Sequence, residues 1–364
     1  MRTGYNNKCL MKVGDFSCTI NTPKAIEDKG DGVHRLPPYA QKEVFVVDEY
    51  PACPDNWMCG SKNSSSYFVS IEENTGLWFD FNQNGFLEND VAVVISIQGI
   101  NPITGQKTDK LILEQYTECP IHKKEFGQDR FCKECGFKWP KQNYLSSSST
   151  PVGMFWLDGF RMPDGKVRQW VFTKEQIRSV AKAVIGEDRV FAIGIAFYKS
   201  KEKNQKLRRI NNYSDNYDLK TKLYKKNMTW DYHNTPQWTN CDDVYGSITC
   251  SSLGAEAYAP DDDAFTSKGK QQTNKILRSS RISGQHCVNE VRSIDISEKF
   301  EVAAGAKIEQ SVYDDINDLN SWEKDPSGFI YVNYASKEDV DKILNAGKRK
   351  EVSEGFLANI PTGN

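Results

Sequence analysis

Short apolar runs separated by polar turns dominate the chain between residues 41 and 198. The runs are rich in β-branched and aromatic residues, which favour strands. They lie at residues 44–47, 67–71, 77–81, 91–97 and 111–116. In the run 91–97 both alternating faces are apolar, as expected for a strand that is covered on both sides. The pattern therefore predicts a β-rich core in which the strand at 91–97 is central.

A hairpin and a helix are predicted next. Residues 155–161 and 166–172 flank the sequence Met-Pro-Asp-Gly, whose proline and glycine suit a turn, so we predict a β-hairpin. Thr173 and Gln176 have the spacing of a capping box, and Gly186 can end the helix that follows in the left-handed conformation. The apolar face of this helix would consist of Ile177, Val180, Ala181, Val184 and Ile185.

Regular patterns continue at 190–198, predicted as a strand, and return near the end of the chain. Residues 329–334 are predicted as another strand. Ser336 with Asp339 would cap a helix that stops at Gly347. Its apolar face would consist of Val340, Ile343 and Leu344.

Two stretches are polar and lack a sustained period. We interpret residues 1–40 as an extended N-terminal arm and residues 199–285 as a polar excursion or insertion. The β-rich core then spans 41–198 with an insertion at 116–145, and an α+β segment occupies 286–364. The predicted fold class is α+β and β-dominated, with a mixed or antiparallel sheet or sandwich core and a few short helices.

Composition narrows the class of protein. The chain has 364 residues, 12% of them aromatic, which is typical of a folded globular protein. A net charge of −2 argues against a protein that coats nucleic acid or membrane through global charge. The most apolar run is far shorter than the roughly 18 residues of a membrane helix, and the N-terminus has no apolar leader. We therefore expect a cytoplasmic protein with no membrane contact.

Ten cysteines are too few for a disulfide scaffold in a chain of this length, so a reducing compartment is the simpler interpretation. Seven of them show no metal-ligand spacing: Cys9, Cys18, Cys53, Cys59, Cys241, Cys250 and Cys287. A disulfide between Cys241 and Cys250 is the less favoured alternative.

The strongest motif lies in the insertion. Cys119-Pro-Ile-His122 and Cys132-Lys-Glu-Cys135-Gly are two ligand pairs, each with two intervening residues, separated by nine residues. Such pairs converge on one ion while a glycine just beyond the second pair allows a tight turn. The pattern resembles a zinc ribbon over about 30 residues, with His122 where many ribbons have cysteine. The resemblance implies a zinc ion held by Cys119, His122, Cys132 and Cys135.

Four protein ligands complete a tetrahedral shell, whereas a hydrolytic zinc keeps one position for water, so we expect a structural ion. Free structural cysteines are the alternative. A zinc deaminase would need His-x-Glu and a Pro-Cys-x-x-Cys pair, yet Lys124 stands at the glutamate position and Phe131 precedes Cys132. Phe131, Phe137 and Trp139 are expected to pack over the metal rather than to stack on bases.

A segment after the run 77–81 imitates a calcium loop. Oxygen ligands would come from Asp80, Asn82, Asn84 and Glu88, with Gly85 at the sharp turn. Val91 stands where a bidentate glutamate belongs, and Asn84-Gly85 suits a hairpin turn. A turn is therefore favoured over a calcium site.

One basic and aromatic patch lies at 199–230, which contains ten Lys or Arg residues and only three acidic ones. Its candidate binding residues are Lys206, Arg208, Arg209, Tyr213, Tyr217, Lys222, Lys225 and Lys226. Three interpretations are open, in falling order of preference. The patch is a solvated loop, it contacts an acidic surface of a neighbouring subunit, or it binds nucleic acid. An acidic partner is available in Asp314, Asp315, Asp318, Glu323 and Asp325.

No nucleophile–base pair, phosphate-binding glycine loop or paired carboxylate stands out, so the sequence does not indicate an enzyme. We favour a structural subunit of a homo-oligomeric assembly stabilised by a structural zinc site. The alternative is an adaptor that binds nucleic acid or protein through the ribbon and the patch at 199–230.

Overall fold

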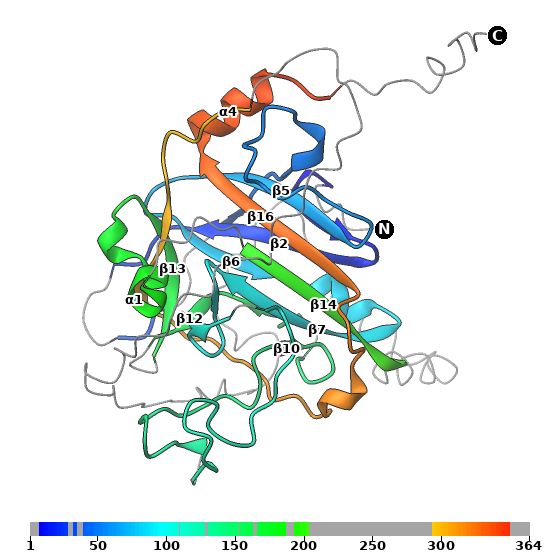
Figure 1. Ribbon diagram of the computed structural model, residues 1–364, viewed down its shortest axis with the longest axis vertical. Helices are drawn as coiled ribbons and strands as arrows, with labels where there is room; N and C mark the ends of the chain where they lie inside the picture. Colours follow the sequence, from blue (N-terminus) through cyan, green and yellow to red (C-terminus); the bar gives the residue numbers. More distant parts are fainter. Residues whose placement is uncertain are drawn as a thin grey trace, which may run out of the picture.

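The computed structural model describes residues 7–27, 32–34, 39–108, 110–127, 130–151, 153–162, 166–186, 193–203 and 293–349. Two eight-stranded β-sheets pack against each other as a β-sandwich, with α4 at one end and the loops around residues 116–145 at the other (Figure 1). The prediction of a β-dominated α+β fold is confirmed. Among the described residues, no helix is long and apolar enough to cross a membrane.

The first sheet has the order β1-β2-β6-β13-β12, and three more strands pair with members of this path. The path consists of β1 (Leu10–Val13), β2 (Phe16–Pro23), β6 (Gly76–Asp80), β13 (Val167–Thr173) and β12 (Gly159–Arg161). Beside it lie β3 (Tyr39–Gln41), β11 (Trp156–Leu157) and β15 (Glu301–Lys307). The antiparallel pairing of β12 with β13 confirms the predicted hairpin.

The second sheet has the order β4-β5-β16-β14-β7-β8-β9. Its strands are β4 (Phe45–Val46), β5 (Ser64–Ile71), β16 (Gly328–Ser336), β14 (Ile193–Lys203), β7 (Asn89–Ile97), β8 (Ile100–Asn101) and β9 (Gln106–Lys107). β10 (Leu145–Ser146) pairs with β7. This sheet is mixed, because β16 is parallel to β5 and antiparallel to β14.

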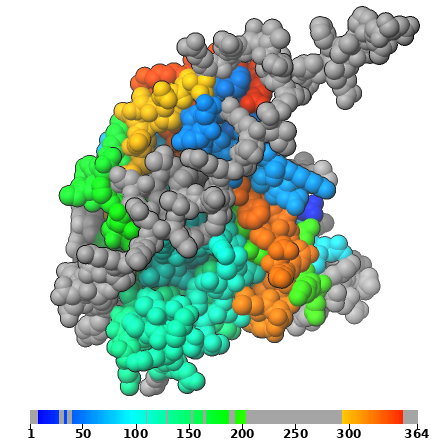
Figure 2. All heavy atoms as spheres, viewed as in Figure 1, coloured from blue at the N-terminus to red at the C-terminus, as the bar shows by residue number. Residues whose placement is uncertain are grey.

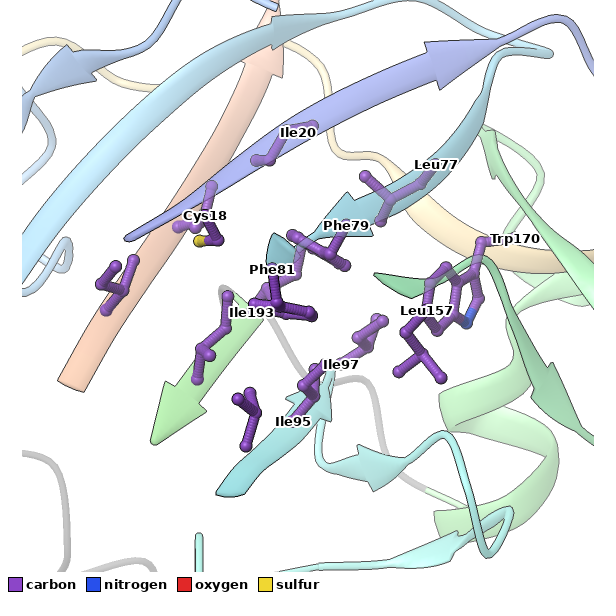
Figure 3. Packing of buried hydrophobic residues seen from close by; sticks show 14 of the residues in the cluster. Cys18, Ile20, Leu77, Phe79, Phe81, Ile95, Ile97, Leu157, Trp170 and Ile193 are labelled. Carbon is purple, nitrogen blue, oxygen red and sulfur yellow. The ribbon is translucent and has the colours of Figure 1, made fainter. Parts of the chain in front are cut away.

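The apolar faces of the two sheets meet in one core (Figure 3). Phe79 and Trp170 from the first sheet and Ile95 and Ile193 from the second are all at most 1% exposed. Fully burying an apolar side chain of this size stabilises a fold by roughly 1.5–3 kcal/mol. The alternation of apolar residues along these strands therefore supplies the main force that holds the sheets together.

Strand β7 is central, as predicted. It pairs with β14 along most of its length and with β10 on its other edge. One face contributes Val91, Val93, Ile95 and Ile97 to the main core. The other face contributes Ala92 and Val94 to a second cluster on the outer side of the sheet. Both faces are apolar because both are covered.

Part of the N-terminal segment belongs to the sandwich rather than to an arm. Residues 10–23 of the expected arm 1–40 form β1 and β2, and β2 pairs with β6 inside the first sheet. Ser17, Thr19 and Asn21 alternate with the apolar core residues and are nevertheless buried. The alternation of a strand is therefore present at Phe16, Cys18 and Ile20, inside a stretch that is polar overall.

The expected helix after β13 begins later than its capping box suggests. Thr173 is the last residue of β13, a 3₁₀-helix spans Gln176–Arg178, and α1 is Val180–Ile185. The Ser179 side chain caps α1 by accepting from the Lys182 N–H at 3.2 Å. Ile177, expected on the apolar face, is 91% exposed. Gly186 ends α1 with φ +76°, as predicted.

Helix α4 (Lys337–Asn345) matches its prediction, with Ser336 as its N-cap and Gly347 just beyond its end at φ +86°. Val340 and Ile343 pack in a small cluster against β5 and β16. The expected strand at 111–116 does not form; this segment is irregular and has one bridge, from Gln115 to Gln142. Most of the expected excursion, from residue 204 on, lies outside the described residues.

Candidate metal centre

The four predicted ligands lie together in an irregular module, residues 116–141, that projects from the second sheet (Figure 1). In the first knuckle the Lys123 N–H donates to the Cys119 carbonyl at 2.8 Å, and Lys123 has φ +53°. In the second, the Gly136 N–H donates to the Cys132 carbonyl at 2.9 Å, and Gly136 has φ +68°. The glycine predicted for the tight turn therefore occupies a left-handed position.

The ligand atoms converge on one point. All four lie within 4.8 Å of one another. The His122 Nδ1 is 3.6 Å from the Cys119 Sγ and 3.7 Å from the Cys132 Sγ. The Cys119 and Cys135 sulfurs are 3.8 Å apart. The three cysteines are buried and His122 is exposed, so this group is close enough to hold a metal ion at the edge of the module.

Backbone dipoles favour the thiolate form of Cys132. Burial raises its pKa, but the N–H groups of Cys135 and Glu134 donate to its sulfur and bring the pKa down to about 7. Burial raises the pKa of Cys135 to about 11, and a hydrogen bond from the Phe137 N–H opposes this rise. A metal ion coordinated by these sulfurs would hold them deprotonated, and the same donors would then stabilise the thiolates.

A small aromatic cluster lies beneath the sulfurs. Phe137 and Trp139 are 3% and 5% exposed and pack with the three cysteines, while Tyr116 contacts the Trp139 ring with centroids 5.6 Å apart. Of the three aromatic residues expected to pack over the ligands, Phe137 and Trp139 do so, whereas Phe131 is half-buried and lies outside this cluster. Rings buried in this way are not available for stacking on bases.

Arg130 joins the two ends of the module, a role the sequence did not reveal. Its guanidinium donates to the carbonyl of Tyr116, to that of Trp139 at 3.2 Å and to that of Pro140 at 3.0 Å. It also lies 4.6 Å from the centre of the Phe126 ring. The three carbonyls belong to the segments by which the chain enters and leaves the module, so Arg130 fixes their separation.

Asp315, expected among surface acids, is fully buried. Its carboxylate accepts hydrogen bonds from Tyr144 Oη at 2.8 Å, Trp322 Nε1 at 3.0 Å and Ser148 Oγ at 3.0 Å. Ser146, Ser149 and the Asn317 N–H also donate to it. Such a set of donors offsets the cost of burying the carboxylate charge, so no cation is needed beside it. The other expected acids, Asp314, Asp318, Glu323 and Asp325, are exposed.

The segment that imitates a calcium loop forms a 3₁₀-helix, Asn82–Phe86. Its oxygens serve the chain itself: Asp80 Oδ1 accepts from the Asn82 N–H at 2.8 Å, and Asn82 Oδ1 accepts from the Phe155 N–H at 2.9 Å. Asn84 is fully buried and its Oδ1 accepts from the Ser17 N–H at 3.0 Å. Glu88 is exposed. The polar residues here hold β2 to the 3₁₀-helix.

From residue 204 on, the predicted binding patch at 199–230 lies outside the described residues, as do Cys241, Cys250 and Cys287.

In the described part, a cavity of about 10 Å³ lies between the sheets near α1. Its walls are apolar apart from Gln98, whose amide nitrogen donates to Tyr334 Oη at 2.9 Å and to Glu301 Oε2 at 3.2 Å. It has room for a single water molecule and none for a substrate.

The chain matches no protein-family model, no curated protein and no solved structure. The chemistry of the Cys119, His122, Cys132 and Cys135 group is therefore the main guide to function. Three sulfurs and one imidazole nitrogen, arranged within 4.8 Å of each other, are suited to bind one soft or borderline metal ion.

Proposed function

We propose that this chain is a structural subunit of a homo-oligomeric assembly and that Cys119, His122, Cys132 and Cys135 hold a structural zinc ion. The observation that carries the proposal is the closed set of four protein ligands in a module that has little apolar core of its own. Such modules depend on the ion for folding.

The ligand separations support zinc. Tetrahedral zinc with Zn–S of about 2.3 Å and Zn–N of about 2.0–2.1 Å requires sulfurs about 3.8 Å apart and sulfur–nitrogen separations of about 3.6 Å. Three of the six separations match these values: 3.8 Å between Cys119 and Cys135, and 3.6 and 3.7 Å from the His122 Nδ1 to Cys119 and Cys132, and all six are within 4.8 Å. Three thiolates and an imidazole are also typical ligands of structural zinc.

A structural role follows from the closed shell. With four protein ligands, no coordination position is left for a water molecule that zinc could activate. The three sulfurs are also buried, at 0%, 3% and 8% exposure for Cys119, Cys132 and Cys135. The ion would therefore link the two knuckles and the aromatic cluster beneath them.

Exposed apolar residues support self-association. Of the seven large hydrophobic residues that are exposed in the described part of the chain, four belong to the module, to residues 111–116 that lead into it, or to residues 313–322. These are Ile112, Ile121, Ile316 and Leu319. A contact with a second copy of the chain through the module and the segment 313–322 would cover these residues. At the module tip Lys124 pairs with Glu134. Residues 116–145 contain six basic and four acidic residues, which is a small excess of positive charge for a phosphate backbone.

Metal analysis combined with multi-angle light scattering tests both halves of the proposal. We expect one zinc per chain and a single species larger than a monomer. A monomer would contradict the assembly, and a chain purified without zinc from zinc-containing medium would contradict the metal. Retention on single-stranded nucleic acid that falls steeply with salt would instead favour the adaptor. A Cys59→Ser variant, which alters a cysteine outside the cluster, provides the matched control for cysteine replacement.

A further inference from the structure

The outer face of the second sheet is apolar and depends on irregular segments for its cover. Ala92 and Val94 of β7 and Ala196 and Tyr198 of β14 are each at most 2% exposed on this face. The residues packed on them are Leu111, Leu113, Tyr144 and Trp322. Leu111 and Leu113 lie in the entry segment, residues 111–116, which leads into the metal module, and Tyr144 lies in the exit segment, residues 141–146, which leaves it. Trp322 ends a third segment, residues 313–322, which we call the strap.

The strap has little regular structure of its own. Its one element is the 3₁₀-helix Leu319–Ser321. Trp322 forms a bridge with Ser200 of β14, and side chains of the entry and exit segments hold the part around Asp315. Lys141 Nζ donates to the Asp315 carbonyl at 2.6 Å, and the Asp315 N–H donates to Gln142 Oε1 at 2.9 Å. Gln115 Nε2 donates to the Asn317 carbonyl at 2.7 Å. The strap surface lies beside the module surface (Figure 2).

The entry and exit segments are in turn held together at the base of the module. The Tyr116 N–H donates to the Lys141 carbonyl at 2.8 Å, and Gln115 bridges to Gln142. Arg130 binds carbonyls on both sides. Because Arg130 lies between His122 and Cys132 in the chain, its position depends on the fold of the metal-binding loops. A module with few apolar residues keeps that fold only while the ion links its knuckles.

We infer that metal bound by the module controls a cover over the outer face of the second sheet. Loss of the ion frees Arg130, loosens the contacts between the entry and exit segments at the base of the module and thereby loosens the strap with Trp322. The face formed by Ala92, Val94, Ala196 and Tyr198 then becomes accessible and promotes non-specific association. The inference rests on the proposed function for the bound metal, and it adds a coupling between metal content and the surface that the subunit presents.

Hydrogen–deuterium exchange on the full chain, before and after removal of zinc by a chelator, tests the coupling. Peptides that contain 111–116, 141–146 and 313–322 should exchange on the order of tenfold faster after chelation. Peptides from β2 should keep their rate, because the main core does not depend on the module. Zinc content is measured on the same samples, and binding of a hydrophobic dye should increase in parallel.

Two results would overturn the inference while leaving the zinc site in place. The first is complete zinc removal with unchanged exchange in the strap. The second is equal acceleration in β2 and the strap, which would make the ion a support of the whole chain. Absence of zinc from the purified protein would overturn the proposed metal site and the metal dependence together, and the zinc measurement separates that case from the other two.

Asp315→Asn tests the cover without touching a ligand. The amide cannot accept the same set of donors, so the strap should exchange on the order of tenfold faster while zinc content stays unchanged. Asp325→Asn, at an exposed carboxyl three residues after Trp322, is the matched control and should leave the exchange rate unchanged. Unchanged strap exchange in Asp315→Asn would show that the carboxylate does not hold the cover.

Discussion

The Tyr144 hydroxyl donates a hydrogen bond of 2.8 Å to the Asp315 carboxylate, and both side chains are fully buried although 171 residues separate them in the chain. The same hydroxyl accepts from Gln115 Nε2 at 2.7 Å. One phenol thus connects the entry segment, the exit segment and the strap. Burial raises the pKa of Tyr144, and the negative charge of Asp315 raises it further because two negative charges there would repel.

Replacement of Tyr144 by phenylalanine should lower the free energy of unfolding by about 1–3 kcal/mol, because a buried carboxylate loses a donor and the Gln115 amide loses its acceptor. Equilibrium unfolding in urea measures the change. Tyr331→Phe is the control, since that ring stacks on Phe329 with centroids 6.1 Å apart and the structure describes no hydrogen bond of its hydroxyl. Equal stability of the wild type and Tyr144→Phe would show that the network contributes nothing.

Cys132→Ser should abolish stoichiometric zinc binding while the sandwich stays folded, because the main core contains no residue of the module. At neutral pH a serine hydroxyl is a much poorer zinc ligand than a thiolate. Zinc content and far-ultraviolet circular dichroism of the variant measure the two effects. Cys59→Ser should keep both properties of the wild type. Global unfolding of Cys132→Ser, or of the chelated wild type, would contradict the separation of module and core.

Asp158 should make stability depend on pH. Its side chain is 4% exposed, its Oδ1 has no hydrogen-bond partner, and burial raises its pKa to about 7. Its pKa in the unfolded chain is about 3.9. Between these values the unfolded state releases a proton that the folded state retains, so this group's contribution to stability decreases as pH rises from about 4 to 7. In this range the free energy of unfolding falls by up to about 1.4 kcal/mol per pH unit.

Asp158→Asn removes this titration and should gain stability relative to the wild type by a few kcal/mol at pH 8, with a much smaller difference near pH 4. Urea unfolding at the two pH values measures it. Asp325→Asn changes an exposed carboxyl and should show no such trend. A wild-type-to-variant difference that is the same at both pH values would mean that Asp158 does not titrate in this window.

Asn84→Ala should lower the free energy of unfolding by about 2–4 kcal/mol, because the Ser17 N–H, the Ser17 carbonyl and the Phe81 carbonyl all lose a buried partner. Addition of millimolar calcium should leave the melting temperature of the wild type unchanged, since the oxygens of Asp80, Asn82 and Asn84 already accept hydrogen bonds from the chain. A rise in melting temperature with calcium that Glu88→Ala removes would establish an ion site instead.

Features encoded in neighbouring residues could be predicted from the sequence. The apolar alternation of β7, the hairpin that ends in β13 and the cap and apolar face of α4 depend on contacts a few residues apart or on a pattern that repeats every two or four residues. The Cys119, His122, Cys132 and Cys135 group belongs to this class, because two short turns bring its members together.

Other features were decided only by the tertiary structure. The alternation of β2 is present in the sequence, but its pairing with β6 and the burial of Ser17, Thr19 and Asn21 depend on segments that sequence alone does not place. The segment 111–116 has the composition of a strand, but its apolar residues Leu111 and Leu113 pack on the outer face of the second sheet without pairing as a strand.

The sequence by itself determined the β-rich class, the central strand and the four candidate ligands, because local periodicity and spacing carry that information. The tertiary structure decided that Asp315 is a buried acceptor rather than a surface charge, and that Arg130 fixes the base of the module. The physical reason is that burial removes water as a partner, so the role of a charge depends on donors and acceptors that the fold brings from distant parts of the chain.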